Sequence, residues 1–456
     1  MIKLINLTIF RDMLVSKKNL LVILFFCFLG LGSIFTSTFT DPSFSFPENT
    51  EVRQSLYANL TGSNKEARST LPEWTVIEAS GVKVNFFTEI VNNEDGSSIY
   101  FCFSHGTDLD FSKGTIGSYI IKRSLDEHDD INYGITQIKI FYKNNDNSFI
   151  RLLPSVNKQE SVMEIQLYGR TTQKNIKVPL SLAELSRRSF SEMASLTSNY
   201  VDWSFYITDY KKLYGDDVRL LSEAIDPLLF FLREEEDGAI NREGNFVYID
   251  SLELQKDKGG LNCSGFAKWV VDGIYKPIVG ENIDIAYLKE KHYELRGNRW
   301  SEKLEDEKDP YFGLDWTRNL AFEIMKLKEP ESILSSVDVK NLRYHEYKEN
   351  IGFPIEDIKT VLYELAVKYP YNFYLGSLNN KSNTPPYLRQ HTHVVVLFPY
   401  IDQKGNFQAL VYSLNEKISL EYLKSNWKDN YIHLVQIEAS TRFEPSGINF
   451  NPVIRR

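Results

Sequence analysis

The sequence predicts an α+β protein with a β-rich N-terminal domain and a mixed C-terminal domain. Short β-rich runs broken by polar turns fill residues 73–180. From residue 181 to residue 456, runs with helical periodicity alternate with further β-rich runs. The chain has 456 residues, 42% of them hydrophobic and 13% aromatic, so it is long and apolar enough to build more than one core.

Residues 1–40 predict a signal peptide or a membrane anchor. Four basic residues, the last of them Lys18, precede the uncharged run 20–40, whose length suits a bilayer span. Basic residues before the span place the body outside the cytoplasm. We therefore expect a cell-envelope protein, either anchored in the membrane or secreted to the periplasm. The polar residues 41–72 predict a linker.

The net charge of −9 argues against a nucleic-acid partner, because the chain has no basic surplus to neutralise phosphates. Cys27 lies in the N-terminal apolar run, which leaves Cys102 and Cys263 in the body. Two cysteines in an oxidising compartment can form one disulfide, and that alternative stays open at this point.

Eight short runs predict strands in the first domain. Regular spacing of this kind is typical of an antiparallel sandwich or barrel, so we expect an all-β, sandwich-like domain over residues 73–180. Its sequence carries no catalytic pattern, and a binding or spacing role is expected. The predicted strands are residues 75–79, 82–91, 98–104, 116–122, 135–142, 149–153, 162–168 and 175–178.

The second domain is expected over residues 181–456. Strands are predicted at 373–378 and 431–439, and a hairpin turns at residues 402–406, where Gly405 stands. A charged, helix-rich stretch covers residues 276–350. Further helices are predicted at residues 180–196, 216–234 (kinked by Pro227), 355–368 and 420–427.

Residues 259–273, GGLNCSGFAKWVVDG, have the features of a segment that presents a nucleophilic side chain. Its apolar residues recur at helical spacing from Phe266 onward, and Asn262 is a good N-cap, so Cys263 falls at the first helical position. The helix dipole and unpaired N–H groups there favour the thiolate, which predicts a lowered thiol pKa. Gly265 leaves room for another chain beside the sulfur.

A thiolate nucleophile needs a base, and His393 is the candidate, at the start of the first hairpin strand. A turn centred near Lys404 pairs His393 with Asn415. It also places Ser413 opposite Val395, which lies on the same face of the strand as His393. Asn415, or failing that Ser413, could then orient the imidazole. Strand alternation gives His391 the same parity, so it is an alternative base or a neighbour. His292, His345 and His433 show no partner pattern and are expected to be structural.

The segments LNCSGFAKWVV and THVVVLF resemble the NlpC-type cell-wall peptidases, a branch of the papain-like cysteine peptidases. The resemblance implies a papain-like domain with an insertion near residues 276–350. It further implies that Cys263 is the nucleophile, that His393 is the base, and that Asn415 or Ser413 orients it. The family also carries a Tyr before its Cys, and Tyr248 is the nearest match. Tyr248 and His391 are therefore the substrate-binding candidates.

This sequence departs from the family pattern at three points. Asn262 replaces an Asp before the Cys, the Trp-Gly-Gly element after the Tyr is missing, and 130 residues separate Cys263 from His393. The resemblance implies an exported cysteine amidase or peptidase that hydrolyses amide bonds in peptidoglycan stem peptides without a metal or other cofactor. The alternatives are a non-catalytic envelope binding or scaffold protein on the same fold and a transglutaminase-like acyltransferase.

Overall fold

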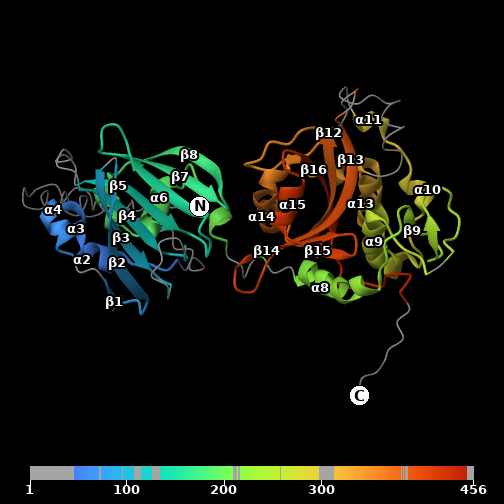
Figure 1. Cartoon of the computed structure of the whole chain (residues 1–456), viewed down its shortest axis with the longest axis horizontal. Helices are drawn as coiled ribbons and strands as arrows, with labels where there is room; N and C mark the ends of the chain where they lie inside the picture. The colour runs from blue at the N-terminus through green and yellow to red at the C-terminus, as the bar shows by residue number, and fades with distance from the viewer. Residues whose placement is uncertain are drawn as a thin grey trace, which may run out of the picture.

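The protein is an α+β molecule of two domains, each built on its own antiparallel sheet (Figure 1). The computed structural model describes residues 46–448 except 71–72, 95, 107–113, 126–133, 209–212, 214–215, 257, 297–312, 382, 384 and 386–388. The predicted signal or anchor, residues 1–40, lies outside the described residues. Within the described residues, no helix combines the length and the apolar character that a membrane span needs.

The first domain contains one eight-stranded sheet in which every strand pairs antiparallel with the next along the chain. All eight predicted strands are present, but the prediction of a two-sheet sandwich is wrong. Each strand pairs with its neighbour in sequence, so the strands form one sheet, and helices rather than a second sheet cover its buried face. The strands are β1 (Glu73–Ile77), β2 (Lys83–Asn93), β3 (Gly96–Ser104), β4 (Tyr119–Ser124), β5 (Ile135–Phe141), β6 (Phe149–Pro154), β7 (Ser161–Leu167) and β8 (Arg170–Val178).

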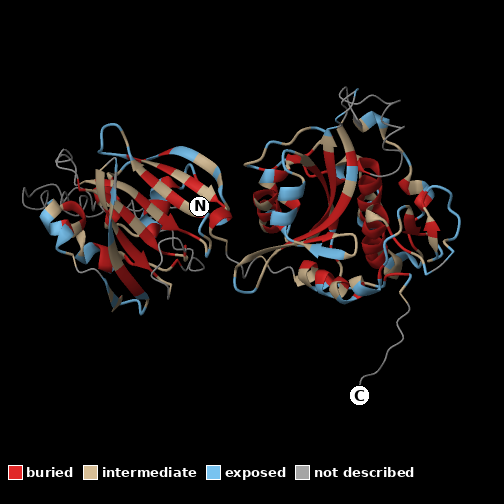
Figure 2. Ribbon diagram, viewed as in Figure 1, coloured by how far each residue is buried: buried red, intermediate tan, exposed pale blue. Residues whose placement is uncertain are grey.

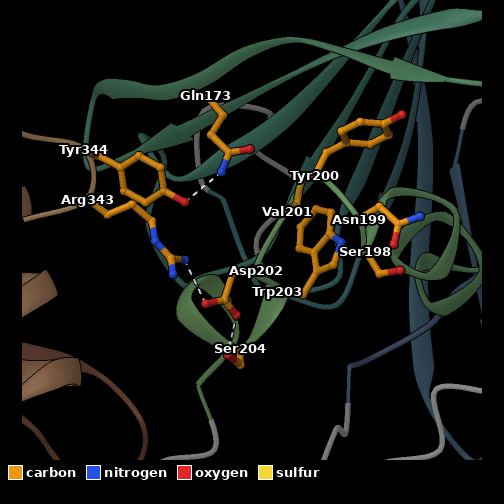
Figure 3. A pocket seen from close by; sticks show the side chains of 10 residues that line it. All are labelled: Gln173, Ser198, Asn199, Tyr200, Val201, Asp202, Trp203, Ser204, Arg343 and Tyr344. Carbon is orange, nitrogen blue, oxygen red and sulfur yellow. Dashed lines mark hydrogen bonds and ion pairs between the residues drawn. The ribbon is translucent and has the colours of Figure 1, made fainter.

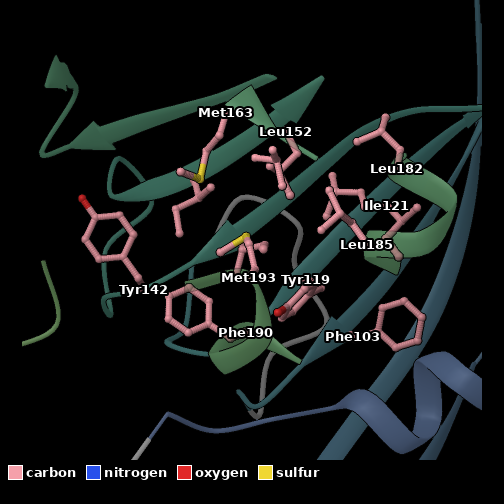
Figure 4. Close-up of a cluster of buried hydrophobic side chains, with 14 of the residues drawn as sticks. Phe103, Tyr119, Ile121, Tyr142, Leu152, Met163, Leu182, Leu185, Phe190 and Met193 are labelled. Carbon is pink, nitrogen blue, oxygen red and sulfur yellow. The ribbon is translucent and has the colours of Figure 1, made fainter. Parts of the chain in front are cut away.

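Three helices that follow β8 belong to this first domain. They are α5 (Leu182–Ser186), α6 (Phe190–Thr197) and α7 (Trp203–Tyr206). Figure 4 shows Leu182, Leu185, Phe190 and Met193 packed among strand residues such as Tyr119 and Leu152. The predicted boundary at residue 180 therefore falls too early, because apolar side chains up to Tyr206 complete the core.

Residues 46–70, the described part of the predicted linker 41–72, are not a linker. Within them lie α2 (Thr50–Ser55), α3 (Tyr57–Thr61) and α4 (Asn64–Arg68), and Val52 and Leu60 enter the first core. Arg53 is fully buried, stacks 4.0 Å from the Tyr119 ring centre and donates a 2.7 Å hydrogen bond to the Ser186 carbonyl. The polar composition of this segment did not indicate these helices, because one of the side chains that packs into the core is the charged Arg53.

The second domain is built around a six-stranded antiparallel sheet in the order β11-β16-β12-β13-β14-β15. A separate small ladder pairs β9 with β10. The strands are β9 (Gly238–Ile240), β10 (Phe246–Tyr248), β11 (Phe353–Pro354), β12 (Asn372–Lys381), β13 (Arg389–Ile401), β14 (Phe407–Ser413), β15 (Glu416–Ile418) and β16 (Tyr431–Glu438).

Helices cover both faces of this sheet, and each face has its own buried core (Figures 1 and 2). The first face packs against α8 (Asp216–Ile225), α9 (Cys263–Val279) and α13 (Leu314–Lys328). The second packs against α14 (Ile358–Lys368) and α15 (Leu420–Asn426). The other helices in the described part of this domain are α10 (Ile285–Leu288), α11 (Tyr293–Arg296) and the 3-10 turns η2 (Asp226–Phe231), η4 (Leu334–Val337) and η5 (Ile355–Asp357).

Helix α13 lies within residues 276–350, where the sequence resemblance implies an insertion. Trp316 and Leu320 of α13 are buried in the same core as α9, so this helix is a structural layer of the domain. The two domains also touch directly. Tyr363 of α14 enters the first core and donates a 2.7 Å hydrogen bond to the Phe205 carbonyl.

Candidate functional site

Helix α9 begins at Cys263, as the sequence predicts. Asn262 caps the helix: its Oδ1 accepts a 2.7 Å hydrogen bond from the Gly265 N–H, and its Nδ2 donates to the Glu236 carbonyl at 3.1 Å. The cap satisfies one of the N–H groups that have no intrahelical partner at a helix start. It therefore fixes the direction in which the thiol leaves the helix.

Two neighbours hold this helix start in place. A Cβ on Gly265 would lie 2.0 Å from the Gly238 carbonyl oxygen in β9, so only glycine allows this approach. On the other side, Trp316 Nε1 donates a 3.1 Å hydrogen bond to the Ser264 carbonyl. The predicted close approach at Gly265 is confirmed, and the approaching chain is β9.

The hairpin of β13 and β14 has the register that the sequence predicts. Gly405 turns with φ +81°, and the Asp402 N–H donates to the Asn406 carbonyl at 2.9 Å. Antiparallel hydrogen-bonded pairs recur every second residue, so even-numbered residues of β13 bond toward β14. The β13–β14 ladder ends at Val396, which pairs with Tyr412, and the next partner along β14 would be Leu414.

Leu414 cannot continue the ladder because it turns the chain into β15 with φ +57°. The N–H of Val394 is therefore left open at the edge of β13, and the Cys263 sulfur lies against it. The N–H groups of Val394, Ser264 and Cys263 itself all favour the thiolate, but burial outweighs them and raises the thiol pKa. The predicted lowering of this pKa is wrong, because desolvation of the half-buried sulfur dominates over the helix terminus.

His393, next to Val394, has a fixed orientation. Its Nε2 lies 2.9 Å from Ser413 Oγ, and its ring stacks on Trp427 with centroids 6.0 Å apart and planes at 14°. Burial lowers the imidazole pKa, so the ring is neutral at neutral pH. Of the two predicted orienting residues, the structure brings Ser413 to the imidazole. Asn415 lies in the turn between β14 and β15.

The structure brings Cys263 to the residue beside His393 but does not join their side chains. His393 points to the α14 and α15 face with Leu378, its pair in β12. Helix α9 packs on the opposite face, where Val394 is buried. In the described part of the chain, no hydrogen bond links the Cys263 sulfur with the His393 imidazole, and no described residue bonds His393 Nδ1.

His391 lies on the other face of the sheet from His393, and the predicted shared parity is wrong. A β-bulge pairs His393 with Leu378 and His391 with Asn379, two consecutive residues that point to opposite faces. His391 is buried, and its Nε2 lies 3.1 Å from the Asn350 carbonyl oxygen. His391 therefore belongs to a buried polar cluster under the α13 face.

That cluster surrounds Arg318 of α13. The guanidinium forms a bidentate ion pair with Asp338, with hydrogen bonds of 2.9 and 2.7 Å, and its Nη2 also donates to Asn350 Oδ1 at 2.9 Å. His433 lies beside Asp338 and bonds the Tyr347 hydroxyl at 3.0 Å. The cluster ties the end of the sheet to α13, which in turn holds the start of α9.

Tyr248, the substrate-binding candidate, pairs with Gly238 in the small β9–β10 ladder. The Gly238 carbonyl accepts the N–H of Asn262 at 2.9 Å, so Tyr248 is one strand away from the residue before Cys263. The other histidines expected to be structural also have local partners. His292 Nε2 lies 2.7 Å from Asn319 Oδ1, and the His345 ring packs against Phe353.

A cavity of about 220 Å³ opens beside His393. Trp427 and the contact of the Val394 N–H with the Cys263 sulfur are the parts of this site that were not predicted from the sequence. The Trp could have been sought as an aromatic residue near the last strand, but the N–H contact depends on where β14 ends. The cavity is lined by His393, Ser413, Ile418, Tyr422, Leu423, Asn426 and Trp427.

Cys102 and Cys263 are both free thiols and lie in different domains, so the structure contains no disulfide between them. Cys102 is buried in β3, and burial raises its pKa strongly. Within the described ranges, no cluster of three or more His, Cys, Asp or Glu side chains is arranged to hold a metal ion.

Comparison with known proteins identifies one family model. It is described as "Domain of unknown function (DUF8515)" and matches residues 42–205. That range covers the eight-stranded sheet with its flanking helices and ends within α7, close to the structural end of the first domain. No curated protein and no solved structure matches the chain.

Proposed function

We propose that the second domain is a papain-like cysteine hydrolase of the NlpC type, in which Cys263 is the nucleophile and His393 the base. One observation carries this proposal: the thiol sits at a capped helix start, against the backbone N–H that follows His393. Ser413 binds Nε2 of that histidine, which leaves Nδ1 to exchange a proton with the thiol.

In the proposed reaction, His393 takes the thiol proton as the sulfur attacks an amide carbonyl carbon. The carbonyl π electrons move to oxygen, and the Cys263 N–H donates to that oxyanion. The C–N bond then breaks, the imidazolium proton goes to the leaving amine, and a thioester remains. Water, deprotonated by His393, then attacks the thioester carbonyl carbon; the C–S bond breaks, a carboxylic acid is released, and the imidazolium returns its proton to sulfur.

In the present geometry the two groups are not paired, because His393 points to the α14 and α15 face of the sheet and α9 packs on the opposite face. The thiol and the imidazole are both neutral, and the ring is turned toward Ser413 and Trp427. Catalytic hydrogen bonds are often long or poorly aligned in ligand-free enzymes and shorten once substrate binds. The proposal requires the imidazole to approach the sulfur when substrate enters.

The proposed substrate is an amide bond in a peptidoglycan stem peptide, and the proposed location is the cell envelope. Both follow from the sequence resemblance and from the basic, then apolar, N-terminus. Purified protein should release new amino groups from isolated peptidoglycan. Cys263→Ala should abolish that release, and Cys102→Ala is the matched control. Equal release by wild type and Cys263→Ala would overturn the proposal.

A second candidate is a non-catalytic envelope binding protein on the same fold. The raised thiol pKa and the missing sulfur–imidazole hydrogen bond favour it. The two candidates differ in what an activated acyl donor does: a hydrolase forms a thioester at Cys263 and turns it over, whereas a binding protein does neither. The acyltransferase alternative would pass the acyl group to an added amine in preference to water.

A further inference from the structure

A second cavity, of about 630 Å³, lies where the two domains meet (Figure 3). Most of its wall comes from the first domain, as Gln173 of β8 and the consecutive residues 198–204. The second domain contributes Arg343 and Tyr344. Small-molecule sites occur preferentially at domain interfaces and in this range of volume.

The two walls are tied together by polar contacts across the interface. Gln173 Nε2 donates a 2.7 Å hydrogen bond to the Tyr344 hydroxyl, and Arg343 Nη1 lies 2.8 Å from Asp202 Oδ2 (Figure 3). Arg170 adds a 3.2 Å hydrogen bond to the Tyr344 carbonyl. The cavity therefore has a defined shape that depends on both domains.

The lining has no charge left over for an ionic ligand. Asp202 and Arg343 are its charged residues, and they neutralise each other. The groups that remain open are neutral: the Asn199 amide, the Gln173 Oε1 and the Tyr200 hydroxyl make no hydrogen bond with a described residue. Such groups suit a ligand rich in hydroxyl and amide groups.

Aromatic rings provide the apolar part of the lining. Tyr200 is 67% exposed, whereas Trp203, which also lines the cavity, is 3% exposed. The C–H face of a pyranose ring is apolar and packs well on an exposed aromatic ring, while its hydroxyl groups need donors and acceptors around the edge. The cavity offers both within one loop.

We infer that this interdomain cavity binds a neutral oligosaccharide, with Tyr200 as the stacking platform and Asn199 and Gln173 as hydrogen-bonding partners. The choice of an N-acetylated wall glycan as its ligand rests on the proposed function, whereas binding itself does not require catalysis. A glycan held here would tether the wall to both domains while a stem peptide is cleaved at Cys263.

Titration calorimetry of the Cys263→Ala full chain with N-acetylglucosamine tetramer tests this inference. We expect saturable binding that weakens about tenfold or more in Tyr200→Ala, which corresponds to the loss of about 1.4 kcal/mol. Asn199→Ala should also weaken binding. Tyr371→Ala, a change at an exposed tyrosine of the second domain, is the matched control and should leave the affinity unchanged.

Two results would overturn the inference: absence of saturable tetramer binding to the folded protein, or unchanged affinity in Tyr200→Ala. A free stem peptide that displaces the tetramer from the cavity would also contradict it, because the site would then be a peptide site. Amino-group release from peptidoglycan is measured separately with wild type. Failure of that assay alone would remove the proposed hydrolase and leave glycan binding standing.

Discussion

The imidazole Nε2 of His393 and the hydroxyl of Ser413 lie 2.9 Å apart, at the point where β14 leaves β13. This contact determines which imidazole nitrogen can serve the thiol. Ser413→Ala should therefore lower amide hydrolysis by about fivefold, which corresponds to the loss of one hydrogen bond of about 1 kcal/mol. Asn415→Ala, in the adjoining turn, should leave the rate unchanged. Rates on the same peptidoglycan preparation provide the comparison, and a larger loss in Asn415→Ala would refute this assignment.

The reactivity of Cys263 should reflect a buried thiol. Because burial raises its pKa above the ordinary value of 9.0, iodoacetamide should label it slowly at pH 7, with a rate that climbs until above pH 9. Cys102 is more deeply buried and should stay unlabelled in the folded protein. Peptide mapping after timed labelling provides the measurement. If Cys263 is already fully reactive at pH 7, its thiol pKa is not raised, and stabilisation of the thiolate outweighs the effect of burial.

The pH range of hydrolysis should be wide. Activity requires that the thiol and the imidazole carry one proton between them. Acid adds a second proton to the pair, and alkali removes the first. Burial lowers the His393 pKa below 6.5, so the acid limb should fall below that pH. Burial raises the Cys263 pKa, so the alkaline limb should lie above pH 9.0. A rate profile from pH 4 to pH 10 tests both limbs. A narrow maximum between two ordinary pKa values would be inconsistent with the buried pair.

Buried His391 should make the protein less stable in acid. Its folded pKa is lowered to about 4, against an ordinary 6.5, because of burial, and Arg318 beside it acts in the same direction. A lowered folded pKa means that the unfolded chain binds more protons, so this stability is present above pH 6.5 and is lost as pH falls toward 4. The loss at pH 4 is roughly 3 kcal/mol.

The groups that face His391 are Arg318, His433, Asp315 and the Asn350 carbonyl. His433 is also held neutral, so it adds to the acid sensitivity in the same direction. Denaturant unfolding at pH 7 and pH 4.5 should show a smaller loss in His391→Gln than in wild type. An equal loss in both proteins would assign the acid sensitivity elsewhere.

The first domain should fold as a fragment of residues 46–208 and not as residues 73–180. The shorter fragment would expose core contacts of Val52, Leu60, Phe190, Trp203 and Tyr206. At about 2 kcal/mol for each buried side chain, the loss is comparable to the whole stability of a domain. Circular dichroism and thermal melts of both fragments would decide this. A cooperative melt of residues 73–180 would contradict the boundary drawn here.

Local signals allowed much of this site to be predicted from the sequence. The N-cap at Asn262 and the turn at Gly405 depend on neighbouring residues, so the start of α9 and the hairpin register are correct. The position of His391 depends on a bulge against β12, a strand distant from the hairpin turn, and simple alternation fails there. Burial is also a property of the whole fold, which is why the direction of the Cys263 pKa shift was predicted wrongly.

The same limit applies to the first domain. Its eight strands could be read from their own alternation, but the covering layer could not. Whether a buried face meets a second sheet or helices depends on segments elsewhere in the chain. Here those segments include a polar stretch whose buried residue is Arg53. Its contacts with Ser186 and Tyr119 explain why composition alone indicated a linker.

The central claim is that Cys263 and His393 act as one catalytic pair, and acylation by p-nitrophenyl acetate tests it without knowledge of the natural substrate. We expect a stoichiometric burst of p-nitrophenolate, an acetyl group mapped to Cys263, and no burst from Cys263→Ala. His393→Ala should slow acylation by about 100-fold or more, the usual contribution of a general base. Acylation of Cys263 at the same rate with and without His393 would contradict the account.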